Sequence, residues 1–185
     1  GNGSRCAVMF AHHLKMIEFE TNFLTIEGPL HAIIENDLVH LRMPDVTDIM
    51  QTEKEDLFLN TGSPHYVRFV ENFENYSILE IGKEIRQSNE FAPEGTNVNF
   101  VQLKSKGEIF VRTYERGVEN ETLSCGTGVT ASALAFGKNL KKGEVKIMTL
   151  GGELTVRFEQ VQKGMFQNIY LIGPAEKVFD GSVLV

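Results

Sequence analysis

One short pattern occurs twice in the chain, and this repeat limits the folds that the chain can adopt. A Gly-x-Gly turn followed by small and apolar residues begins at Gly1 and again at Gly126. Similar turn and strand patterns follow both copies, with residues 25–28 matching 149–152 and residues 38–44 matching 168–174. Two copies of one unit at this long spacing indicate a duplicated domain rather than a solenoid. We therefore expect two similar domains, each built around one helix.

The second copy carries a cysteine, Cys125, directly before its first glycine. The Ala-rich run at residues 129–136 predicts a buried helix, so this cysteine would lie at a helix N-terminus. Unpaired N–H groups and the positive end of the helix dipole favour an anion there, and glycines let it approach closely. We expect the pKa of Cys125 to fall below about 8.5, beside a seat for a carboxylate or phosphate. A buried structural cysteine is the alternative.

The first copy begins at its glycine, where the second copy has a cysteine just before. We therefore expect a cysteine directly before Gly1 in the intact protein. On this interpretation the chain is a fragment of a longer protein, and the isolated fragment is inactive.

Three further residues lie in patterns that suggest a polar site. An arginine at a strand end, as Arg116 is after the strand predicted at 109–114, can grip a carboxylate with two parallel N–H bonds. His65 follows a Gly-Ser-Pro turn, where an ordinary loop histidine is an equal alternative. Asn97 follows Gly-Thr, where a turn residue is the usual explanation.

These motifs, taken in order, resemble the diaminopimelate epimerase family of cofactor-independent amino-acid epimerases. The resemblance covers nearly the whole chain and rests on residues 1–6, 62–65, 93–100, 114–128 and 173–175. It implies an α/β (α+β) fold of two similar domains, each a curved mixed β-sheet wrapped around a central helix, with the first domain incomplete. Residues 1–46 would form the rear part of the N-terminal domain, 47–173 the C-terminal domain, and 174–185 a segment returning to the N-terminal domain.

The resemblance also implies an activity and a set of site residues. The reaction would interconvert LL- and meso-2,6-diaminopimelate, for lysine and peptidoglycan precursors, without a cofactor or a metal. Inverting a carbon needs a base on one face and an acid on the other, which a pair of cysteines on opposed helix N-termini provides. The implied catalytic residues are Cys125, His65 and Glu115. The implied substrate-binding residues are Gly1, Asn2, Ser63, Asn97, Glu115, Arg116, Gly126 and Thr127. Ser63 stands where the family usually has an asparagine.

Composition narrows the range of partners. The net charge of −7, with no basic stripe, argues against nucleic acid. No apolar run reaches the length of a membrane span, so no membrane partner is expected. Two cysteines without a framework spacing fit a reducing compartment. We expect a cytoplasmic protein with a small-molecule substrate, and the resemblance implies a homodimer.

Three other functions stay open at this point. Residues 126–131 also fit the dinucleotide fingerprint Gly-x-Gly-x-x-Ala, although polar residues rather than an apolar strand precede it. A hydroxyproline-type epimerase on the same fold is a closer alternative. A non-catalytic module that binds carboxylates is the third.

Hydrophobic periodicity predicts the remaining elements. Helices are expected at 4–14, buried on most sides, and at 78–87. Turns are expected at 27–29 and 142–143. Strands are expected at 16–21, 23–26, 30–35, 39–43, 57–60, 66–70, 97–103, 109–114, 145–148, 153–158 and 169–172.

Overall fold

The computed structural model describes residues 1–25 and 28–183. The end of the strand predicted at 23–26 and the start of the turn predicted at 27–29 lie outside the described residues. The helices are α1 (Asn2–His13), α2 (Ile78–Arg86) and α3 (Gly126–Phe136). The strands are β1 (Glu20–Thr25), β2 (Gly28–Glu35), β3 (Leu38–Arg42), β4 (Met50–Gln51), β5 (Leu57–Asn60), β6 (Pro64–Val70), β7 (Asn97–Ser105), β8 (Glu108–Glu115), β9 (Asn120–Thr122), β10 (Lys142–Thr149), β11 (Gly152–Gln162) and β12 (Met165–Gly173).

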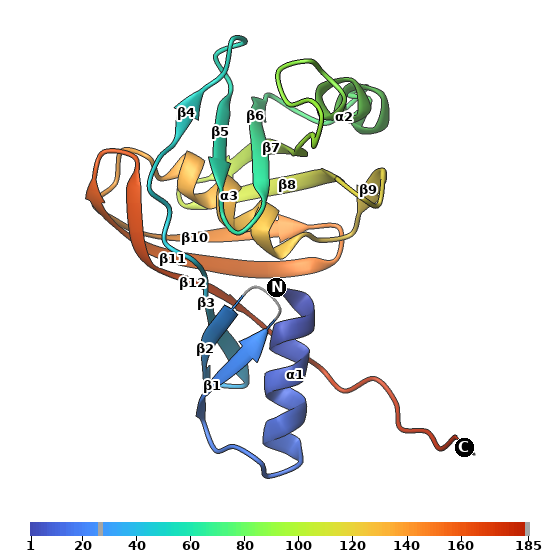
Figure 1. Ribbon diagram of the computed structural model, residues 1–185, viewed down its shortest axis with the longest axis vertical. Helices are drawn as coiled ribbons and strands as arrows, with labels where there is room; N and C mark the ends of the chain where they lie inside the picture. Colours follow the sequence, from blue (N-terminus) through green and yellow to red (C-terminus); the bar gives the residue numbers. More distant parts are fainter. Residues whose placement is uncertain (26–27, 184–185) are drawn as a thin grey trace.

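The strands join in one continuous order, β1-β2-β3-β12-β11-β10-β8-β7-β6-β5-β4, with β9 paired to β8. Most neighbours are antiparallel, but β6 with β7 and β8 with β10 are parallel. Figure 1 shows this sheet curving around α3 in its upper part, while α1 lies beside β1 to β3 in the lower part. The predicted class, a mixed α/β protein with a curved mixed sheet, is confirmed. The domain boundaries at 46 and 173 stay a prediction.

The two parts of the sheet meet where β3 pairs with β12. Val39 to Arg42 lie opposite Gly173 to Tyr170 in antiparallel register. An isolated bridge between Val46 and Phe166 extends the contact. This seam sets the position of α1 relative to α3, because each helix packs on the strands of its own side.

The two helices of the repeat differ sharply in burial. In α3, Gly126 and all residues from 128 to 135 are buried, because strands on several sides enclose the helix. In α1 the buried residues are Arg5, Val8 and Met9, and Phe10 is 63% exposed. The expectation that the first helix is buried on most sides is therefore wrong. Its packing partners among the strands are β2 and β3, which cover one face.

Two other sequence predictions also differ from the structure. Residues 16–19 form no strand, because α1 ends in a left-handed turn at Lys15, with the Met16 N–H donating to the Ala11 carbonyl. The predicted turn at 142–143 is the start of β10 instead. Gly143 is needed there for packing, since a Cβ at this position would lie 2.5 Å from the Phe158 ring.

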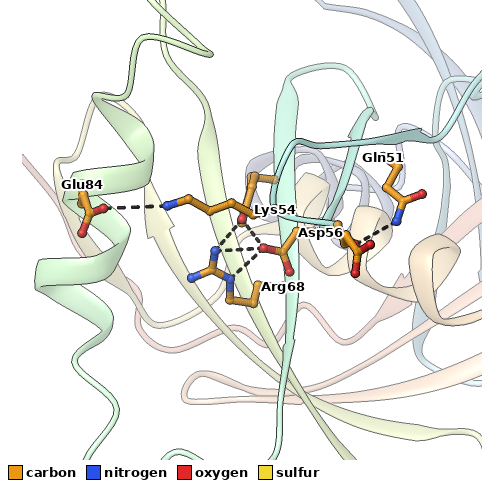
Figure 2. Close-up of polar contacts among 7 residues, drawn as sticks. Gln51, Lys54, Asp56, Arg68 and Glu84 are labelled. Atoms are coloured by element: carbon orange, nitrogen blue, oxygen red, sulfur yellow. Dashed lines mark hydrogen bonds and ion pairs between the residues drawn. The ribbon is translucent and has the colours of Figure 1, made fainter.

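A cluster of charged and polar side chains braces the end of β5 and β6 that lies away from their connecting turn (Figure 2). Arg68 Nε donates to Asp56 Oδ2 at 2.9 Å, and the Tyr66 hydroxyl donates to the same oxygen. Figure 2 also shows the exposed pair of Lys54 with Glu84, 3.9 Å apart. The cluster holds one end of the hairpin whose other end carries the turn at residues 61–63.

Within residues 1–25 and 28–183, none of the helices has the length and apolar character needed to span a membrane.

Candidate functional site

The N-termini of α1 and α3 meet backbone to backbone. Gly1 caps α1 and Cys125 caps α3. A Cβ on Gly126 would lie 2.9 Å from the Gly1 Cα and 3.0 Å from Leu171 Cδ2, and a Cβ on Gly1 would lie 3.2 Å from the Gly126 Cα. A side chain at Gly126 would therefore force the backbone to shift, and one at Gly1 would make a tight contact. Two sets of N–H groups and two helix dipoles therefore point toward one region.

A cavity of about 590 Å³ opens beside this meeting point. Gly1 and Thr127 line it from the helix ends, and Thr61 and Gly62 line it from the turn between β5 and β6. Residues of β1 to β3 and Asp45 form the other walls. Gly62 has a φ of 104°, a conformation that favours glycine, and its N–H donates to Asn60 Oδ1. The cavity thus has helix N-termini on one side and a tight glycine turn beside them.

The pKa of Cys125 departs from the expectation. The residue is 8% exposed, and this burial raises the pKa of its thiol above the ordinary value, with the nearby Glu115 carboxylate acting in the same direction. The Thr127 hydroxyl, 3.5 Å from the sulfur, and the first N–H groups of α3 act to lower the pKa but do not outweigh burial. The predicted drop in the Cys125 pKa is therefore wrong for the described structure, because the helix dipole is opposed by desolvation.

His65 lies fully buried at the start of β6. Its Nε2 is 3.0 Å from Ser63 Oγ and its Nδ1 is 3.0 Å from Asn99 Nδ2. Burial, helped by the positive charge of Arg116, lowers the pKa of His65 to about 3. The imidazole is therefore neutral at physiological pH, and it cannot serve as a cationic partner for a thiolate.

Asn97, Glu115 and Arg116 lie together where β7 begins and β8 ends. The Arg116 N–H donates to Asn97 Oδ1 at 2.9 Å, and Asn97 Nδ2 donates to the Pro64 carbonyl at 3.0 Å. Glu115 Oε2 accepts from the Thr122 hydroxyl at 2.9 Å. The Arg116 guanidinium donates to the Gly95 carbonyl across a long distance of 3.4 Å, and this bond uses only one of its N–H groups.

Asn2 lies in the first turn of α1, and a buried arginine orients it. Arg5 Nη2 donates to Asn2 Oδ1 at 2.9 Å. Because this bond uses the amide oxygen, the Asn2 side chain keeps its N–H groups as donors. Arg5 is 6% exposed and burial lowers its pKa. Among the described residues its Nε and Nη1 have no hydrogen-bond partner.

The structure brings most of the predicted site residues into one connected group. Hydrogen bonds link Ser63, His65, Asn97, Arg116, Thr127 and Cys125. Gly1 and Gly126 adjoin this group through the helix contact. Asn2 bonds to Arg5 instead. In the described parts of the chain, no group of three or more His, Cys, Asp or Glu side chains is arranged to hold a metal ion.

Sequence reasoning missed three polar residues that support this group. Thr61 is fully buried, and its hydroxyl donates to the Thr127 carbonyl at 2.9 Å. Asn99 and Thr113 face each other across β7 and β8 and are both buried. The signal was present for Asn99, since a polar residue within the apolar run Val98 to Val101 of a central strand requires hydrogen-bond partners.

Comparisons with known proteins agree with this geometry. The family model described as diaminopimelate epimerase matches residues 57–178. The diaminopimelate epimerase of Flavobacterium psychrophilum is 45% identical over 186 residues, covering 99% of this chain and 72% of that protein. The diaminopimelate epimerase of Aquifex aeolicus is 43% identical over 193 residues, covering 98% of this chain and 68% of that protein.

Solved structures with much lower sequence identity share the fold. A phenazine biosynthesis protein of the PhzF family from Bacillus anthracis matches with a TM-score of 0.70 at 11% identity, covering 93% of this chain and 71% of that one. A hydroxyproline epimerase from Agrobacterium vitis, with bound trans-4-hydroxy-L-proline, matches with a TM-score of 0.66 at 19% identity, covering 94% of this chain and 63% of that one.

Proposed function

Because the chain belongs to the diaminopimelate epimerase family, we propose that it is an isomerase that interconverts LL- and meso-2,6-diaminopimelate by passing a proton between two thiols. The observation that carries the chemistry is the meeting of two helix N-termini beside Cys125. An α-proton next to a carboxylate is weakly acidic, so the carbanion-like transition state needs donors that are fixed in advance. The converging N–H groups provide such donors.

The reacting carboxylate is proposed to lie between the two helix ends. Gly1 and Asn2 would bind it from α1, and Gly126 and Thr127 would bind it from α3. The Asn2 amide suits this role because Arg5 occupies its oxygen and leaves its N–H groups as donors. Both dipoles then oppose the negative charge that develops as the α-proton leaves.

Cys125 is proposed as the acid or base on one face of the α-carbon. Since burial and Glu115 raise the pKa of its sulfur, Cys125 enters as a thiol and donates a proton in one direction of the reaction. In the reverse direction it is the thiolate that removes the proton. Cys6 does not suit the role of the second sulfur, because it is exposed on α1.

The second thiol is proposed directly before Gly1, which is the position that corresponds to Cys125 in the repeat. The contact between Gly1 and Gly126 would place this thiol across from Cys125. The codon for the residue before Gly1 in the intact gene tests this point. A cysteine codon is expected, and any other codon contradicts the two-thiol mechanism.

The far end of the substrate, a second amino-acid group, is proposed to lie against Asn97, Glu115, Arg116 and Ser63. Arg116 can hold a carboxylate with two parallel N–H bonds, and Glu115 can accept from an ammonium group. A buried zwitterion needs a partner for each charge, so a substrate without a distal charged end leaves these groups unpaired and is disfavoured. This distinguishes diaminopimelate from hydroxyproline.

Replacing Cys125 in the intact protein tests the proposal. With LL-diaminopimelate as substrate, Cys125→Ala should lower the rate at which meso-diaminopimelate forms by about 10²- to 10⁴-fold, the usual contribution of a general acid or base. Cys6→Ala is the matched control and should keep the rate of the unchanged protein. Wild-type formation of meso-diaminopimelate by Cys125→Ala would contradict the assignment, and turnover of 4-hydroxyproline would contradict the substrate.

The family resemblance also implies a cytoplasmic homodimer, and this stays a prediction. Light scattering of the intact protein measures its mass in solution, with twice the chain mass expected.

A further inference from the structure

A line of polar side chains, buried at Thr113, Asn99 and His65 and half-buried beyond them, leads from the core to Cys125. It begins at Thr113 on β8, whose hydroxyl donates to Asn99 Oδ1 at 3.0 Å. Asn99 Nδ2 donates to the Tyr66 carbonyl at 3.0 Å. These two contacts fix the orientation of the Asn99 amide, because reversing it would place its oxygen against a carbonyl. The amide therefore presents only hydrogens toward its next neighbour.

That neighbour is the imidazole of His65. Asn99 Nδ2 lies 3.0 Å from His65 Nδ1, so this ring nitrogen must accept a hydrogen bond. A neutral imidazole with an accepting Nδ1 carries its proton on Nε2. The ring stays neutral because burial lowers its pKa to about 3. Nε2–H therefore donates to Ser63 Oγ, 3.0 Å away.

The hydroxyl groups of Ser63 and Thr127 come next, and the bond from His65 determines the direction in which each one donates. Ser63 Oγ accepts from His65 and, at 3.4 Å, from Asn97 Nδ2, so its own hydrogen is left for Thr127 Oγ1 at 3.2 Å. Thr127 accepts this bond and turns its hydrogen to Cys125 Sγ at 3.5 Å. Each hydroxyl alone could donate or accept, but the fixed Asn99 amide and the His65 tautomer leave one arrangement of hydrogen bonds.

Resting on the proposed function, we infer that Asn99, His65 and Ser63 are positioning residues that hold the Thr127 hydroxyl as a donor to Cys125. No proton is transferred along the line, and its role is to present hydrogen rather than a lone pair to the sulfur. A hydroxyl that donates stabilises a thiolate, whereas one that accepts stabilises a thiol. The line thereby opposes the burial and the Glu115 charge that disfavour the thiolate.

Packing keeps the line in register. Thr61 holds the Thr127 backbone through its carbonyl, at 2.9 Å. Gly128, the next residue along α3, lies so close to the line that a Cβ there would be 2.4 Å from Asn99 Oδ1. Thr61 therefore holds the Thr127 end of the line, and Gly128 is packed closely against the Asn99 end.

Alkylation of Cys125 by iodoacetamide tests the donor role without requiring epimerase activity. Its rate would be followed against pH, with peptide mass mapping to separate Cys125 from the exposed Cys6. In Thr127→Val the pKa should rise by about one unit, so the rate near pH 8 falls about tenfold, or about 1.4 kcal/mol. Thr127→Ser keeps the hydroxyl and should retain the rate.

Ser63→Ala tests whether the hydrogen bond from Ser63 fixes the direction in which the Thr127 hydroxyl donates. Thr127 then loses the bond that it accepts and can turn its hydrogen away, so the alkylation rate should fall by roughly threefold. Ser105→Ala, at an exposed serine that bonds Glu108, is the matched control and should leave the rate unchanged. Unchanged rates in both Thr127→Val and Ser63→Ala would overturn the inference.

The tautomer of His65 supplies a second measurement on the unmodified protein, which holds even if a variant fails to fold. Long-range nitrogen–proton NMR correlations should show Nε2 protonated and Nδ1 unprotonated, with no titration of this ring near neutral pH. A proton on Nδ1 would reverse the line and refute the inference. Failure of diaminopimelate turnover with the expected alkylation and tautomer would instead refute the proposed function alone.

Discussion

Gly128 and Gly3 are the third residues of the two Gly-x-Gly turns, and we expect opposite results when each is changed to alanine. A Cβ at Gly128 would lie 2.4 Å from Asn99 Oδ1, and 3.3 Å from both Cys125 Cβ and Thr113 Oγ1. A Cβ at Gly3 would meet no atom within 4 Å. The same substitution therefore enters a filled core in one helix and open space in the other.

The size of the effect follows from these contacts. Overpacking a filled core costs about 1 to 3 kcal/mol. Displacing Asn99 Oδ1 also breaks its bond from Thr113, and an unsatisfied buried group costs about 1 to 3 kcal/mol. Since relaxation reduces the sum, Gly128→Ala should lower the free energy of unfolding by about 2 to 4 kcal/mol. Gly3→Ala should raise it by up to about 1 kcal/mol, because alanine favours a helix over glycine.

Urea unfolding followed by circular dichroism measures both changes, and thermal unfolding gives a second estimate. For a chain of this size, the Tm of Gly128→Ala should fall by roughly 5 to 15 °C. Equal stability of Gly128→Ala and the unchanged protein would refute the packing argument. A loss in Gly3→Ala as large as that in Gly128→Ala would show that both turns are buried alike.

Two further predictions concern charge. Asp56→Ala should lower the free energy of unfolding by about 2 to 3 kcal/mol, because Arg68 and the Tyr66 hydroxyl both lose the carboxylate that they share. Lys54→Ala, at an exposed pair, should cost under about 0.5 kcal/mol, and equal losses in urea titrations would contradict this. Burial lowers the pKa of His65 to about 3, whereas a histidine in the unfolded chain has a pKa of about 6.5. As the pH decreases below about 6.5, only the unfolded state gains this proton, so the free energy of unfolding should fall by up to about 1.4 kcal/mol per pH unit. His65→Asn should flatten this slope, and an unchanged slope would contradict the burial argument.

Apolar patterns in the sequence predicted the elements around α3 well. The apolar run at 129–136 forms most of the buried helix α3, and the alternating run at 109–114 lies in β8, both as expected. The same kind of pattern gave a wrong prediction for α1, which was expected to be buried on most sides. An apolar composition shows that a helix face can be buried, but not how many neighbouring elements cover it. Gly143 was wrongly predicted as a turn residue for a related reason. In the sequence, a glycine that makes room for the Phe158 ring cannot be told from a glycine in a turn.

Predictions for the site were limited because a single sequence does not show how deeply each polar residue is buried in the folded protein. The position of Cys125 at a helix N-terminus was predictable from the glycines that follow it, and the structure confirms the helix. The direction of its pKa was not, since burial and the charge of Glu115 arise from the folded surroundings. Thr61 and Thr113 were also missed, because isolated threonines are common in turns and strands and their partners lie on other elements of the fold.

The bare contact between Gly1 and Gly126 has a consequence for how such a protein can change. No side chain lies between the two helix ends, so substitutions there cannot adjust their separation by small steps. The spacing instead depends on how Val39 to Arg42 align with their partners on the neighbouring strand. Evolution or design that changes the gap to suit another ligand would have to act on this strand junction, while Cys125 and the two glycines stay unchanged.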